Sequence, residues 1–319
     1  MSADYLRLKN IPSGVGFPLV TRQVKENLIN FFNWGFINAG GFSNVTVGSS
    51  GTYAAVDKSR LRLSTDARYQ QGQVWEGFTN QWVWESGLLD FTQPIQISGV
   101  YVNGAFQPLS GVGAYAHKIN YRDGQVIFTN PIATNSTVKC EFSYKWTKWV
   151  DAETPWFKQI INLNDRVDSS QFQSTSGNWN NLSQERLPLP AVGVKVNQRF
   201  TLQGRQIGGG HWINQDIVFH VLAEDEDTRN QIKDIIMYQT DKQLLMYDYN
   251  ARPPSLNYDG TLGTNPKTYA DLVNEITVAP AYRTMYFETI NGLDLGSINN
   301  RIFASMVRVT MRVYADDIV

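Results

Sequence analysis

Residues Ile217 to Tyr247, IVFHVLAEDEDTRNQIKDIIMYQTDKQLLMY, give the clearest indication of how this chain folds. The apolar run from Ile217 to Leu222 predicts a strand. Glu224 to Asp227 suit the start of a helix, because acidic side chains cap the first turn and favour the positive end of the helix dipole. The helical spacing continues with Ile232, Ile235, Ile236 and Gln239. Leu244 to Tyr247 then predict the next strand. The stretch therefore predicts a strand–helix–strand module.

Two more elements are predicted in the chain after this module. Residues Tyr269 to Ile276 predict a short helix, and Phe303 to Tyr314 predict a long strand. In that strand apolar residues such as Val307 alternate with Arg308, Thr310 and Arg312, which is the period of a strand with one buried face and one wet face.

The sequence before residue 150 is rich in strand signals. Ile95 to Tyr101 is a short apolar strand, and Asp-Gly in Tyr121 to Val126 predicts a hairpin turn. Val138 to Thr147 alternate between apolar and polar residues, which predicts one ten-residue strand. Short strands separated by turn signals favour a small antiparallel sandwich or barrel.

Two further helices are predicted. The first begins at Thr21, which could serve as its N-cap, and ends at Gly40 and Gly41. The second covers Asp151 to Leu163, with proline in its first turn. A polar stretch without periodicity, Asp168 to Ser183, then predicts a long loop, and long polar loops are often functional.

Together these patterns predict an α+β protein of two domains. A chain of 319 residues is longer than a single domain with one hydrophobic core usually is. Residues 1–150 are expected to form an N-terminal helix and a small antiparallel β-sandwich. Residues 151–319 are expected to form a mixed α/β sheet domain that carries the polar loop at 165–186.

Composition narrows the classes of function. The 28 Lys and Arg nearly balance the 29 Asp and Glu, so no basic stripe for direct, sequence-specific nucleic-acid binding is expected. Cys140 is the single cysteine, and no apolar run approaches the ~18 residues that cross a bilayer. These features predict a protein made and folded in the cytosol, without a membrane partner.

Chemical motifs point away from catalysis. His117, His211 and His220 have no metal-site spacing, and the chain has no Gly-x-Ser-x-Gly elbow or phosphate loop. We therefore predict no enzyme activity, no metal and no cofactor. One alternative stays open, because carboxylate pairs of glycoside hydrolases are recognised only by distance. The carboxylates that lie among aromatic residues are Glu76, Glu85, Asp90 and Glu141.

Trp75, Trp82 and Trp84 crowd one short span, and the last two have the spacing of one strand face. Aromatic pairs can form a platform for a sugar or a base. Buried aromatics that anchor a core or a subunit contact are the favoured interpretation.

The pattern of residues 217–247, followed by Arg301 to Tyr314 (RIFASMVRVTMRVY), resembles neck and tail-terminator proteins of tailed bacteriophages. The resemblance covers about the last third of the chain and is one of pattern. It implies a structural virion protein, made in the host cytoplasm, whose copies form a ring, here expected to be a hexamer. Such a ring would cap the tail tube or sheath and face the portal-bound connector, with no cofactor and no turnover.

The resemblance directs attention to surfaces that copies could share. Each surface also has an interpretation without a partner: the aromatic span could be a core cluster, the polar loop could be disordered, and the face of the last strand could simply be solvated. The candidate interface residues are Trp75, Trp82 and Trp84 of the aromatic span, Gln171, Phe172, Asn178 and Trp179 of the polar loop, and Arg308 and Arg312 of the last strand. Other functions that stay open are a baseplate or collar component, a carbohydrate-binding host-recognition protein, and a carboxylate hydrolase.

Overall fold

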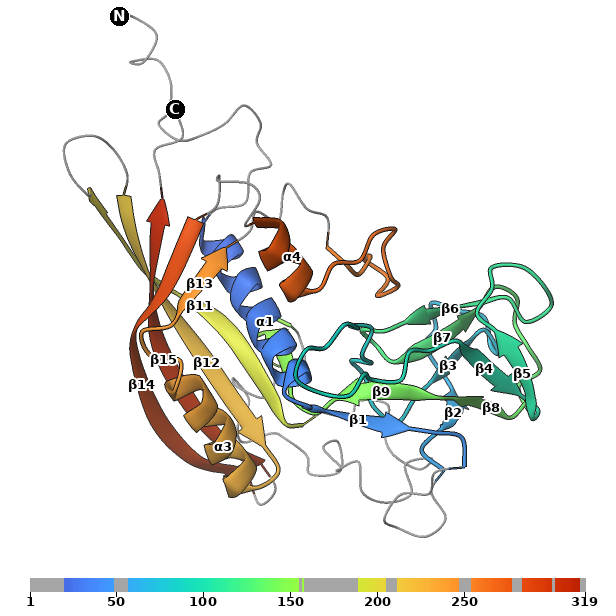
Figure 1. Ribbon diagram of the computed structural model, residues 1–319. Coiled ribbons are helices and arrows are strands. Elements are labelled where there is room, and N and C mark those ends of the chain that lie inside the picture. The colour runs from blue at the N-terminus through green and yellow to red at the C-terminus, as the bar shows by residue number, and fades with distance from the viewer. Residues whose placement is uncertain are drawn as a thin grey trace, which may run out of the picture.

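The computed structural model describes residues 20–48, 57–154, 157, 189–204, 211–246, 254–276, 283–299 and 302–315. It has an N-terminal helix, a unit of short antiparallel strands, and a large mixed sheet with helices packed against it (Figure 1). The predicted α+β class is therefore confirmed.

The first unit is a seven-stranded antiparallel sheet in the order β5-β4-β8-β2-β3-β7-β6, accompanied by the two-stranded pair β1-β9. Its strands are β1 Phe42–Val45, β2 Arg60–Leu63, β3 Val74–Glu76, β4 Gly99–Val102, β5 Ala105–Pro108, β6 His117–Asn120, β7 Gln125–Phe128, β8 Val138–Cys140 and β9 Phe142–Lys145.

Strand β2 turns this sheet into a sandwich-like unit. Its first residues, Arg60 and Leu61, pair with β8, whereas Arg62 and Leu63 pair with β3. A strand that changes partners in this way makes a corner between two half-sheets. Apolar side chains from both halves meet in one core, including Trp75, Val100, Val126 and Phe142.

The predicted hairpin is present between β6 and β7, with Gly124 at a φ of 67° in the turn. Two other strand predictions need correction. Strand β4 begins at Gly99, because the amide of Ile95 bonds instead to the Ser143 hydroxyl at 2.7 Å. The ten-residue strand is two strands, because β8 pairs within the seven-stranded sheet and β9 pairs with β1.

The second unit is a six-stranded sheet in the order β10-β11-β12-β15-β14-β13. Only β10 and β11 pair in parallel, which makes the sheet mixed. Its strands are β10 Lys148–Asp151, β11 Ala191–Gly204, β12 His211–Ala223, β13 Gln243–Met246, β14 Arg283–Asn299 and β15 Ile302–Ala315. The predicted strands at 217–222, 244–246 and 303–314 are confirmed within β12, β13 and β15, while Tyr247 lies outside the described residues.

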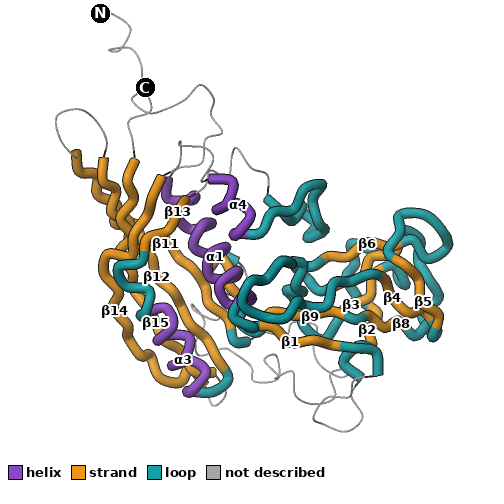
Figure 2. Tube along the Cα trace, viewed as in Figure 1, coloured by secondary structure: helices purple, strands orange, loops and turns teal. Residues whose placement is uncertain are grey.

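Helices α1 (Val20–Asn38) and α3 (Glu226–Met237) lie on the concave side of this sheet, and α4 (Tyr269–Ile276) packs beside α1 (Figure 2). The core between them contains Leu28 and Phe32 of α1 and Ile232 of α3. The ring of Phe32 stacks on Trp149 with centroids 4.3 Å apart. These contacts fix α1 to the six-stranded sheet.

This packing differs from the predicted division at residue 150, which groups α1 with the sandwich. The apolar stripe of α1 shows that the helix buries one face but not which sheet it meets. Thr21 is also not the N-cap, because α1 begins at Val20, and the Thr21 hydroxyl donates to Gln215 Oε1 at 3.2 Å.

The helix predicted from Asp151 does not start there, because Asp151 ends strand β10 and pairs with Val194. Phe157 is helical, and the rest of the predicted helix after residue 154 lies outside the described residues. The polar loop at 165–186 lies outside them as well.

Candidate functional site

Trp75 and Trp82 belong to the core of the sandwich unit. Their side chains are 3% and 1% exposed, and Trp82 stacks on Phe142 with centroids 4.2 Å apart. The indole N–H of Trp82 donates to the Thr79 carbonyl at 3.0 Å. Neither side chain is therefore available to a partner, which corrects their place among the interface residues. Trp84 is half-buried and lines a cavity described below.

The four loop candidates, Gln171, Phe172, Asn178 and Trp179, lie outside the described residues. The strand candidates do lie on the polar face of β15, on the side of the sheet away from α1 and α3. Arg308 is exposed and pairs with the buried Asp216, and Arg312 pairs with Glu288 at 2.5 Å. Both guanidinium groups are thus held by carboxylates of neighbouring strands.

Two edges of the six-stranded sheet are open along much of their length. Strand β10 covers β11 only from Ala191 to Val194, and β13 covers β14 only from Arg283 to Tyr286. Among the described residues no strand pairs with the outer side of either one beyond those points. The open parts lie at opposite ends of the sheet, because β11 and β14 run in opposite directions.

The open part of β14 is only partly protected against pairing, by bulges but not by basic residues or proline. Residues 288–299 include no Lys, Arg or Pro, which are the residues that commonly blunt an edge. Leu293 and Leu295 are 58% and 48% exposed there. Three register shifts bend the strand, at residues 287–289, 294–296 and 297–299. An exposed edge with apolar side chains is a surface suited to strand addition.

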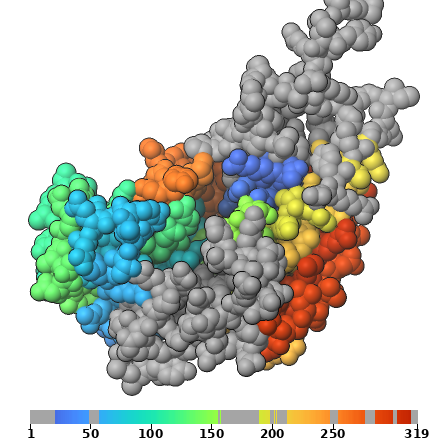
Figure 3. Space-filling view, turned by 180° about the vertical axis from the view of Figure 1, so that it is seen from behind, coloured from blue at the N-terminus to red at the C-terminus, as the bar shows by residue number. Residues whose placement is uncertain are grey.

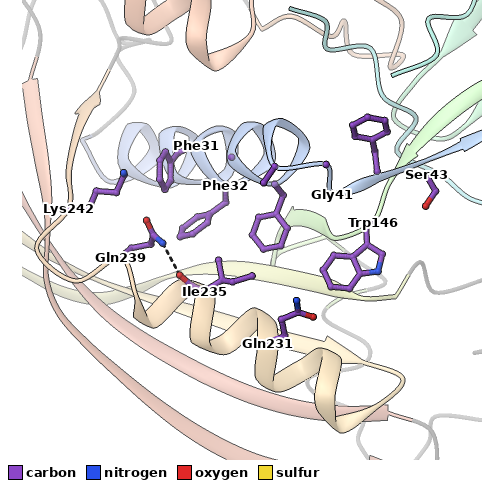
Figure 4. A pocket seen from close by; sticks show the side chains of 14 residues that line it. Phe31, Phe32, Gly41, Ser43, Trp146, Gln231, Ile235, Gln239 and Lys242 are labelled. Carbon is purple, nitrogen blue, oxygen red and sulfur yellow. Dashed lines mark hydrogen bonds between the residues drawn. The ribbon is translucent and has the colours of Figure 1, made fainter. Parts of the chain in front are cut away.

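An apolar groove of about 710 Å³ runs between α1 and α3 (Figure 4). Phe32, Phe36, Trp146 and Ile235 line it, and the space beside the Cα of Gly35 on the rim is open, with no atom within 4 Å of where a Cβ would lie. The side-chain amide of Gln239 donates to the Ile235 carbonyl at 2.9 Å within it. Its lining offers packing surface and few hydrogen-bonding groups.

A second cavity, of about 670 Å³, lies where the two units meet. Helix α1, the β6–β7 turn, β10 and residues 254–272 contribute to its wall. Figure 3 shows part of that last segment in orange, between α1 in blue and the sandwich in cyan and green. The amide of Tyr121 donates to the Gly260 carbonyl at 2.9 Å, and Lys118 pairs with Asp259 at 2.6 Å. These contacts fasten the segment to the sandwich.

Charged groups in this second cavity are held by partners. Lys145 and Glu85 form a buried pair at 2.7 Å, and Lys25 pairs with Asp151. Burial raises the pKa of Glu26, while the positive charges of Lys25 and Arg22 oppose that rise.

The carboxylates considered for hydrolysis have separate partners. Glu76 pairs with Arg62 at 2.8 Å, Glu85 with Lys145, and Asp90 with the Asn38 amide at 2.5 Å. Glu141 accepts from the amide of Val47 at 3.0 Å. The acidic run before α3 works as a helix start, because Asp225 accepts from the Thr228 amide at 2.7 Å.

The histidines are structural where their side chains are described. His117 and His220 are buried, and burial lowers the pKa of both. Within the described ranges no three His, Cys, Asp or Glu side chains come together as metal ligands. Burial also raises the pKa of the Cys140 thiol, which suits a core side chain rather than a nucleophile. None of the described helices is both long and apolar enough to cross a membrane.

No model of a known protein family matches the chain, and no curated protein matches it. Function is therefore inferred from the residues and their geometry.

Proposed function

We propose that this chain is a non-catalytic structural subunit whose copies join head to tail in a closed ring. The two open edges of the six-stranded sheet are the observation that carries this proposal. In each contact the open part of β14 in one copy would pair with the open part of β11 in the next. Different surfaces meet at such a contact, which is the kind that closes a ring by rotation.

Strand direction supports this pairing. Strands β11 and β14 run in opposite directions, so copies related by rotation bring them together antiparallel. Charge adds little to this argument, because the carboxylates on the β14 edge, Glu288 and Asp294, are already paired with Arg312 and Lys233 of the same chain. Because the open parts lie at opposite ends, the copies would be staggered, as tilted strands are around a barrel.

The setting we propose is the neck or the tail end of a tailed bacteriophage, with a ring of six copies between the tail tube or sheath and the connector. The patterns of residues 217–247 and 301–314 support this setting through their resemblance to neck and tail-terminator proteins. A baseplate or collar position would use the same ring.

The test is the mass of the purified full-length chain in solution, measured by light scattering and followed by negative-stain imaging. We expect closed rings with six times the 36.1 kDa mass of one chain. Replacing both Leu293→Lys and Leu295→Lys should leave monomers, because lysine on a sheet edge opposes strand addition.

The matched control replaces two exposed leucines outside the edge, Leu89→Lys and Leu109→Lys, and should still form rings. A wild-type chain that stays monomeric at high concentration would contradict self-assembly. Rings that survive the edge substitutions would show that copies join through another surface.

A further inference from the structure

The cavity between the two units has the dimensions of a binding site within one chain. Its volume of about 670 Å³ falls inside the range of about 300–1,000 Å³ that is usual for small-molecule sites. Segments far apart in the sequence build its wall, so it exists only when both units are folded and joined by residues 254–272.

Three polar atoms of residues that line this cavity are buried without a hydrogen-bond partner among the described residues. They are the side-chain carbonyl oxygens of Asn33 and Asn80 and the indole N–H of Trp149. Buried polar groups are nearly always hydrogen-bonded, and an unmet one is costly. The side chains of Asn33 and Asn80 are half-buried, so rotation of either amide would turn its oxygen toward the cavity, where a ligand with several hydroxyl groups could satisfy it.

The same wall is rich in aromatic rings. Trp84 and Tyr269 are half-buried, and four buried residues complete the aromatic lining, namely Trp34, Trp82, Tyr121 and Trp149. Aromatic faces pack well against the C–H faces of a flat, hydroxyl-bearing ring, while polar groups around the rim fix its orientation.

The charges of the wall argue for a neutral ligand. Lys145 is paired with the buried Glu85, and Lys267 with Glu275 at 3.0 Å. Arg122 pairs with Asp123 at 3.3 Å. Each cation in the wall is already matched by a carboxylate, which leaves none to select a phosphate or a carboxylate.

We propose that this cavity binds a neutral carbohydrate, oriented by the amides of Asn33 and Asn80 and packed against Trp84. A nucleobase fits the observations less well, because its polar groups lie on one edge while the unpaired atoms come from three elements. The site is formed within one chain and does not depend on ring formation.

The test is calorimetric titration of the full-length chain with neutral probes: glucose, galactose, N-acetylglucosamine and their di- and trisaccharides. We expect at least one of them to bind. Asn33→Ala and Asn80→Ala should each weaken that binding by about fivefold to tenfold, the loss of one hydrogen bond. Trp84→Ala should weaken it similarly, and Trp84→Phe should restore most of it.

Stability measurements separate binding from folding. Because the two amide oxygens have no partner among the described residues, Asn33→Ala and Asn80→Ala should not lower the melting temperature of the free chain. Asn135→Ala, on an exposed turn, is the control and should change neither binding nor melting.

Three outcomes would overturn the proposal. They are no heat with any neutral sugar at millimolar concentration, binding that the cavity variants leave unchanged, and preference for uridine, adenosine or a sugar phosphate over the neutral sugars. Ring formation is measured separately, so failure of the sugar site leaves the assembly proposal standing, and the converse also holds.

Discussion

At the scale of single residues, a buried histidine makes the stability of the fold depend on pH. His220 is 8% exposed, and Phe157 lies beside it with ring centroids 6.4 Å apart. Burial, with a smaller contribution from the charge of Lys195, lowers the pKa of His220 from 6.5 to about 4. The folded chain therefore keeps this imidazole neutral at a pH where the unfolded chain protonates it.

The sign of the pH effect follows from this difference. Between pH 6.5 and about 4 the unfolded state binds more protons, so the free energy of unfolding falls as the pH falls through that window. We expect His220 to account for up to about 3 kcal/mol of that loss. Urea unfolding across the window should show a shallower fall for His220→Gln. Equal slopes for the variant and the wild type would contradict the assignment, and His117→Gln should remove a further part of the slope.

At the scale of elements, the cap of α3 gives a direct test of a feature that the sequence already predicts. Asp225→Ala removes the acceptor for the Thr228 amide and should lower the free energy of unfolding by about 1 kcal/mol. Asp234→Ala removes the same charge from the exposed C-terminal half of the helix and should cause no loss. Chemical denaturation of both variants measures the difference, and an equal loss in both would show that charge, not capping, matters.

Elements with a local signal are predictable from the sequence. Helix α3 has its cap and period, the 121–124 turn has Asp-Gly, and β15 has its alternation. The local sequence does not determine which strands pair with each other, which is why it predicts a single strand over Val138 to Thr147. Their alternation is continuous, yet β8 joins one sheet and β9 another. The cavity is not predictable for the same reason, because it joins side chains such as Asn33 and Asn80 from separate elements.

At the scale of the whole molecule, the chain has two cores that can be disturbed separately. Phe32 of α1 lies in the core of the six-stranded sheet, and Phe128 lies in the core of the sandwich. Phe32→Ala should cost about 3–5 kcal/mol and should speed hydrogen exchange in β12 and β15 more than in β6 and β7. Phe128→Ala should give the reverse pattern. Uniform acceleration in either variant would show that the two cores unfold as one.

The packing of α1 against the sheet also has a consequence for synthesis on the ribosome. Helix α1 is made before the sandwich strands, whereas β15, which joins β12 to β14 in the sheet that α1 packs against, is made after them. The sandwich strands emerge in between and can fold while translation continues, because domains generally fold as units. A nascent chain stalled before residue 302 would thus carry a protease-resistant sandwich and an unfinished six-stranded sheet, because β15 lies between β12 and β14. The apolar side chains of the unfinished sheet should bind chaperones until β15 is released.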